Sequence, residues 1–320
     1  MATPLIDALP MLGLAGAVAL GVAATLARPW WTERRRERLR AAPFPPAWRR
    51  LLRREVPQVA RLPADLQQRL KGHVQVFLAE KPMLGCQGQR IDDAVRVSIA
   101  AQACLLLLGD ARPAYFPGLR QVLVYPGAFV VERLRQAPGG LQQSKRQVLA
   151  GESWQQGQVI LSWDDVRVGA ADPQDGENVV LHEFAHQVDQ DKGAADGRPW
   201  RARRSERRRW DAVMGESFAR LQAEPSALFG DYAASDPAEF FAVATERFFE
   251  RPQALAEQAP EVYRELAALY RVHPLAWQAL GAPAQQSGGR RAAAQRLCWG
   301  TVTAAERPNL GRAPQITSKP

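Results

Sequence analysis

Two histidines and a glutamate stand close together in the segment His182-Glu183-Phe184-Ala185-His186. Residues four apart on a helix project from the same face, so His182 and His186 can hold one metal ion. Glu183 lies beside them and can act as general base on a water at that ion. This spacing predicts a catalytic zinc site, with one Zn²⁺ per chain and Glu183 as the catalytic residue.

Apolar residues surround the motif: positions 179–181 precede it and positions 184–185 fill it. Polar groups placed among apolar residues of a packed helix need compensating partners, and metal ligation supplies them. The alternative is a surface helix that contains the motif by chance, which does not explain the apolar neighbours.

A catalytic zinc ion takes a third protein ligand and leaves its fourth position to water. Because no further histidine follows closely, we expect a carboxylate from a later helix. The segment 236–246 offers two, on a helix predicted to begin at Pro237 with Asp236 as its N-cap. Glu239 lies in the first turn and Glu246 two turns later on the same face. One should bind zinc and the other should orient a ligand.

Two of these acidic residues also have simpler interpretations. Asp189 follows His182 and His186 on the same helix face, so it can support the ligands, or it can be a solvated acid at a helix end. Glu246 stands next to Arg247, which is also consistent with a carboxylate on an exposed helix face.

The pattern along the chain indicates helices, then a small sheet, then helices, which is typical of an α+β domain that is mostly helical. Helical spacing and short β-type runs alternate with glycine and polar stretches. The expected helices cover 66–78, 92–108, 178 onward, 205–221, 237–249 and 260–270, and the expected strands cover 121–125, 129–131 and 159–163. We expect the strand at 159–163 to pair with an extended substrate.

The first 27 residues predict a single membrane anchor. Residues 9–27 are almost wholly apolar and are followed by Trp30, Trp31 and a run of arginines at 34–36. This order places the N-terminus outside and the catalytic part in the cytoplasm, on a single-pass protein of the inner membrane. A cleaved signal peptide, a buried core helix and a purely cytoplasmic protein are the alternatives; a signal peptide would need a basic start, which is absent.

The remaining boundaries follow from composition. Residues 28–60 are expected to form a basic linker, 61–283 the zinc peptidase domain, and 284–320 a basic, disordered tail. The chain has a net charge of +9, but the excess lies at its ends and the middle is slightly acidic, so we expect no nucleic-acid partner. Three sparse cysteines suit a reducing compartment, and Cys104 is expected in the core.

Several separated motifs resemble one known family, the Mlc titration factor A family of zinc peptidases. They are HEFAHQVD at 182–189, DYAASDPAEFFAV at 231–243, GESWQQG at 151–157 and VYPGAFVV at 124–131. The resemblance covers residues 60 to 280 and implies a zincin-like, gluzincin-type domain similar to the catalytic domain of anthrax lethal factor.

The resemblance also assigns roles. It implies that Glu239, rather than Glu246, is the third zinc ligand, and that Tyr232 assists catalysis. The family takes its name from a member that binds Mlc, a glucose-responsive transcriptional repressor, and its members show peptidase activity, especially aminopeptidase activity. We therefore expect a peptide or protein substrate. The alternative is a non-enzymatic protein that sequesters a transcriptional repressor.

Overall fold

The computed structural model describes residues 4–136, 142–149, 151–154, 157–193 and 195–278. Side chains are described within these ranges except at 4–19, 129–154, 192 and 278. The expected tail at 284–320 therefore lies outside the described residues. The described residues divide into two compact units, one within 1–129 and 150–285 and the other within 130–149.

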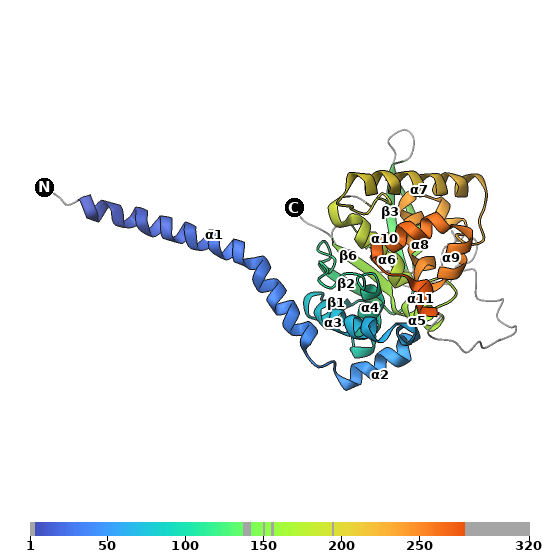
Figure 1. Cartoon of the computed structure of the whole chain (residues 1–320), viewed down its shortest axis with the longest axis horizontal. Coiled ribbons are helices and arrows are strands. Elements are labelled where there is room, and N and C mark those ends of the chain that lie inside the picture. The colour runs from blue at the N-terminus through green and yellow to red at the C-terminus, as the bar shows by residue number, and fades with distance from the viewer. Residues whose placement is uncertain (1–3, 137–141, 150, 155–156, 194, 279–320) are drawn as a thin grey trace. The chain divides into compact units, whose positions relative to one another are not determined.

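The larger unit is mostly helical (Figure 1). Its helices are α1 (Pro4–Ala41), α2 (Pro46–Glu55), η1 (Pro57–Arg61), α3 (Ala64–Glu80), α4 (Asp93–Leu105), α5 (Trp163–Ala171), α6 (Val179–Asp189), η2 (Gln190–Lys192), α7 (Arg204–Ala223), η3 (Tyr232–Ala234), α8 (Pro237–Glu250), α9 (Pro252–Gln258), α10 (Pro260–Tyr270) and α11 (Pro274–Gln278). The α+β class is confirmed.

One small sheet runs through the larger unit, in the order β1 (Met83–Gly85), β2 (Gln121–Tyr125), β6 (Gln158–Ser162) and β5 (Gly151–Trp154). The first three strands are parallel, with Val122 opposite Val159, and β5 is antiparallel to β6. Alternate residues of β2 are fully buried, as a half-buried strand requires. The smaller unit holds a separate two-stranded sheet of β3 (Phe129–Gln136) and β4 (Gln142–Leu149).

Strand β6 cannot be the strand that pairs with substrate, so that expectation is wrong. It is hydrogen-bonded to β2 on one side and to β5 on the other. Both edges of its backbone are therefore already used, and β5 is the outer strand of this sheet. The short run GESW gave no clear strand signal in the sequence, which is why the edge strand was missed.

The structure does not support the expected membrane anchor. Across the side chains that it describes, no helix combines enough length with enough apolar character to cross a bilayer. The apolar stretch 9–27 lies within α1, and its side chains up to residue 19 are outside the described ones.

The basic stretch at 28–60 is helical over most of its length, because α1 continues to Ala41 and α2 follows. Phe44, Leu52, Val56 and Val59 are buried in the same hydrophobic core as the rest of the unit. The division between a linker and a peptidase domain at residue 61 stays a prediction, but these four side chains pack as core residues.

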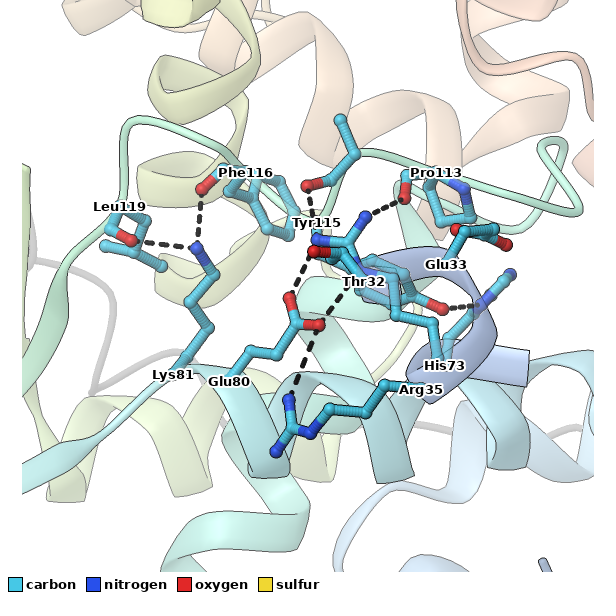
Figure 2. Close-up of polar contacts among 12 residues, drawn as sticks. Thr32, Glu33, Arg35, His73, Glu80, Lys81, Pro113, Tyr115, Phe116 and Leu119 are labelled. Atoms are coloured by element: carbon cyan, nitrogen blue, oxygen red, sulfur yellow. Dashed lines mark hydrogen bonds and ion pairs between the residues drawn. The ribbon is translucent and has the colours of Figure 1, made fainter. Parts of the chain in front are cut away.

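Polar contacts hold the end of α1 against α3 and the loop that leads to β2 (Figure 2). The Arg36 guanidinium donates two hydrogen bonds of 2.8 Å to the carboxylate of Glu80. Arg40 donates to the Tyr115 hydroxyl, which lies 2.8 Å from His73 Nδ1. Next to Tyr115, the Phe116 ring packs against Phe184 of α6, with ring centroids 4.9 Å apart. The loop thus connects α1 with the helix that carries the histidine motif.

Candidate metal centre

Helix α6 presents the histidine motif from a buried position. Asn178 is its N-cap and accepts hydrogen bonds from the N–H groups of Val180 and Leu181. The helix is buried on nearly every face, so the side chains of His182 and Glu183 are only 1% and 3% exposed. Polar side chains this deeply buried must be paired, by protein groups or by a ligand.

Helix α8 supplies the carboxylates. Asp236 caps it by accepting hydrogen bonds from the N–H groups of Ala238 and Glu239, and Pro237 occupies the first turn, as the sequence predicted. Glu239 therefore lies in the first turn, and Glu246 is buried further along the helix.

Three potential metal ligands converge between these helices. One ligand atom from each of His182, His186 and Glu239 lies within 4.8 Å of the others. Glu239 Oε2 is 3.0 Å from His182 Nε2 and 3.5 Å from His186 Nε2. Two imidazole nitrogens and one carboxylate oxygen are a donor set that zinc accepts, and Glu239 rather than Glu246 completes it.

The electrostatics of the cluster favour a bound cation. Burial lowers the pKa of His182, but hydrogen bonds to Glu239 and Glu246 outweigh burial and raise that pKa well above its ordinary value. For Glu239 the two effects have the opposite sign. Burial raises its pKa, but the hydrogen bonds from His182 and His186 outweigh burial and lower that pKa below its ordinary value. A pocket that stabilises positive charge this strongly also stabilises a metal cation.

Glu246 contacts the other side of His182. Its Oε1 lies 2.8 Å from His182 Nδ1, and both side chains are almost fully buried. A carboxylate that accepts a hydrogen bond from Nδ1 keeps the proton on that nitrogen, so Nε2 is the nitrogen that can act as a metal ligand. The interpretation of Glu246 as a carboxylate on an exposed helix face is therefore wrong.

Tyr232, in η3, lies at the edge of the cluster. Its ring centroid is 6.0 Å from that of His182, and its hydroxyl is hydrogen-bonded to Glu239. Burial raises the pKa of Tyr232 above its ordinary value, and the charges of Glu239 and Glu183 raise it further. The phenol is thus protonated and can donate a hydrogen bond.

Asp189 is not a solvated acid at the helix end. It is 4% exposed, and its Oδ2 accepts a hydrogen bond of 2.7 Å from the Gly197 N–H. Burial raises the pKa of Asp189 to about 6. Its visible contact is with the loop after α6, so a supporting role for the ligands stays a prediction.

Sequence reasoning missed the residues behind the site. Asn178 contacts Glu246, Glu250 and Gln102, although these lie far apart in the chain. The only available signal was an asparagine directly before an apolar helical run, which predicts an N-cap but says nothing of its partners.

Cys104 is fully buried, so its predicted place in the core is confirmed.

Comparison with known proteins agrees with this geometry. The family model described as glucose-regulated metallo-peptidase M90 matches residues 30–271. An uncharacterized protein of Synechocystis sp. is 37% identical over 252 residues, which cover 77% of this chain and 91% of that protein.

Two similar proteins carry the name Mlc titration factor A. The one from Salmonella gallinarum is 34% identical over 226 residues, which cover 68% of this chain and 84% of that protein. The one from Cronobacter sakazakii is 34% identical over 257 residues, which cover 78% and 94%. Together with the His-His-Glu cluster, these matches show that the chain belongs to the Mlc titration factor A family of glucose-regulated M90 metallo-peptidases.

Proposed function

We propose that the protein is a zinc peptidase of the zincin type, which hydrolyses peptide bonds of a peptide or protein substrate. The observation that carries this proposal is the convergence of His182, His186 and Glu239 within 4.8 Å, with Glu183 on the same buried helix. His182, His186 and Glu239 would hold the zinc. When bound, the metal supplies Lewis-acid chemistry that lowers the pKa of water and polarises a carbonyl.

Three protein side chains have the remaining catalytic and supporting roles. Glu183 accepts the proton of the attacking water and passes it to the amine that leaves. Tyr232 donates a hydrogen bond to the oxyanion of the tetrahedral intermediate, a contribution worth about 3 kcal/mol in comparable sites. Glu246 keeps His182 in the tautomer with the proton on Nδ1, in which Nε2 acts as the ligand.

The outer strand β5 is the place where we propose that an extended substrate binds. In the described sheet it has β6 on one side only, and it packs against α6, which carries the motif. An unpaired strand edge can hydrogen-bond to the backbone of an extended peptide. A substrate bound there would run beside α6, the helix that carries the two histidines.

Replacing Glu183 by Gln tests the proposal directly. The amide keeps the volume of the side chain but cannot accept the proton, so kcat/KM should fall by roughly 10²–10⁴-fold. The zinc content of the purified protein should not change. Unblocked and N-acetylated fluorogenic peptides as substrates would also separate aminopeptidase from endopeptidase action.

The exposed Glu177, just before α6, provides a matched control. Glu177→Gln makes the same chemical change outside the site and should leave kcat/KM at the wild-type value. Undiminished hydrolysis in Glu183→Gln would contradict the proposed role of Glu183.

A second candidate function follows from the name of the relatives. Proteins called Mlc titration factor A are 34% identical to this chain over most of its length, and their name makes binding of a transcriptional repressor the alternative activity. A pull-down with purified Mlc protein would test it. Binding by a chain that contains zinc but never cleaves a peptide would favour this alternative.

A further inference from the structure

The start of helix α6 contains an incomplete capping box. In a complete box, the N-cap side chain accepts from the N–H groups of the first turn, and the N3 side chain accepts from the N–H of the N-cap residue. Asn178 provides the first half, with its Oδ1 3.1 Å from Val180 N and 3.0 Å from Leu181 N. The N3 residue is Leu181, which has no side-chain acceptor.

Glu246 of α8 supplies the missing half from elsewhere in the chain. The Asn178 N–H donates to Glu246 Oε2 at 2.6 Å. The other oxygen of the same carboxylate, Oε1, accepts from His182 Nδ1 at 2.8 Å. His182 is the fourth residue of α6. One carboxylate therefore both caps the start of the helix and orients a metal ligand.

The side-chain amide of Asn178 fixes this arrangement from two more directions. Its Nδ2 donates to Glu250 Oε1 at 2.8 Å and to Gln102 Oε1 at 2.9 Å. Asn178 is 2% exposed, so solvent cannot replace these bonds. The amide oxygen and amide nitrogen are thus both in use, a combination that a serine or an aspartate cannot reproduce.

We propose that Asn178 is a positioning residue for the metal centre, acting through Glu246 on His182. Its backbone N–H holds the Glu246 carboxylate. Its side chain keeps that N–H in place by capping the first turn of α6 and by bonding to Glu250 and Gln102, and so keeps His182 Nε2 directed at the metal. This inference rests on the proposed function in that His182 is a metal ligand. It adds that the affinity of the site depends on an amide side chain that does not itself touch the side chains of the three ligands.

Zinc affinity of the full chain, measured by competition with a chromophoric chelator, tests the proposal without relying on hydrolysis. Asn178→Ala keeps the backbone N–H that binds Glu246 but removes the side-chain bonds that hold it in place. The affinity should therefore fall by roughly 10-fold, the lower end of the usual cost of losing a group that supports a metal ligand. Asn178→Ser keeps an oxygen for the cap but lacks the amide donors, so it should stay folded and show a smaller loss. It also serves as the test if the alanine variant does not fold.

Asp92→Ala is the matched control, because Asp92 caps α4 through the N–H of Val95 and does not contact the metal cluster. It should lower the melting temperature of the zinc-free protein, though by less than Asn178→Ala because Asp92 is exposed, and it should keep wild-type zinc affinity. If both asparagine variants bind zinc like the wild type, Asn178 is only a helix cap and the proposal is overturned. A wild type that binds zinc without cleaving peptides would contradict the proposed function and leave this proposal standing.

Discussion

At the scale of single residues, the centre is built from polar groups that would be costly to bury alone. Both ring nitrogens of His182 face carboxylates, Nε2 toward Glu239 and Nδ1 toward Glu246. His73, a buried histidine outside the cluster, has different charged neighbours. It lies near two arginines, Arg40 and Arg69, and near a single acid, Asp110. The surroundings therefore raise the pKa of one buried histidine and lower that of the other.

His73 should make the stability of the fold depend on pH. Burial, reinforced by Arg40 and Arg69, lowers its pKa from 6.5 to about 4. Between pH 6.5 and pH 4 the unfolded chain therefore binds more protons than the folded chain. The contribution of His73 to the free energy of unfolding is fully present above pH 6.5 and is lost as the pH falls toward 4. The loss amounts to about 3 kcal/mol. Urea unfolding with chelator present, from pH 7.5 to 4.5, should show a shallower decline for His73→Gln than for the wild type.

The exposed His273 is the control for this experiment. His273→Gln removes a histidine that is not buried and should keep the wild-type decline. Equal pH dependence in the wild type and His73→Gln would show that His73 does not carry the effect.

The candidate site could be predicted in part from the sequence. His182, Glu183 and His186 follow from local helical spacing, and the Asp236-Pro237 start identifies the helix that carries the carboxylates. Local spacing could not choose between Glu239 and Glu246, because the choice depends on which carboxylate meets Nε2 and which meets Nδ1. That is a property of how two helices pack, and only the resemblance to a family had indicated Glu239.

At the scale of elements, the loop after α6 joins the two helices of the metal centre. Gly197 donates its N–H to Asp189 at the end of α6, and its carbonyl accepts a hydrogen bond of 2.8 Å from Trp210 Nε1. Its backbone also lies close to Pro237, at the start of α8. A side chain at position 197 would therefore separate the elements that bring the histidines to Glu239.

Gly197→Ala tests this close approach. At a φ of +75°, a Cβ atom at this position would lie 2.4 Å from the carbonyl oxygen of Pro237. The left-handed backbone and the clash together should cost roughly 2–4 kcal/mol of unfolding free energy. Gly230 has a similar φ of +73° but no atom within 4 Å of a Cβ, so Gly230→Ala should cost only about 1–2 kcal/mol. Equal losses in urea unfolding would contradict the close approach.

The elements themselves show what a sequence pattern can and cannot give. The long periodic helices α3, α7, α8 and α10 lie where they were expected, within a few residues. Strands β1 and β5 were missed because each has at most four residues, too few for a period to be recognised. The outer position of β5 depends on long-range pairing, which no local pattern encodes.

At the scale of the whole larger unit, one hydrophobic core connects the sheet, the metal helices and the stretch after α1. Phe184 belongs to the histidine motif, yet it packs on Phe116 and Phe77. The loop carrying Phe116 is held by Lys81, whose ammonium donates to the carbonyls of Phe116 and Leu119. The metal centre is therefore positioned by the fold as a whole, and a bound metal should in turn stabilise the fold.

Metal analysis of the purified full chain, combined with peptide hydrolysis before and after chelation, tests the central claim most directly. The account predicts one zinc ion per chain, loss of zinc and of hydrolysis together on chelation, a lower melting temperature without the metal, and recovery of all three when zinc is returned. His182→Ala should bind zinc much more weakly than the wild type. A wild type that hydrolyses peptides without metal, or a His182→Ala variant that retains full zinc, would contradict it.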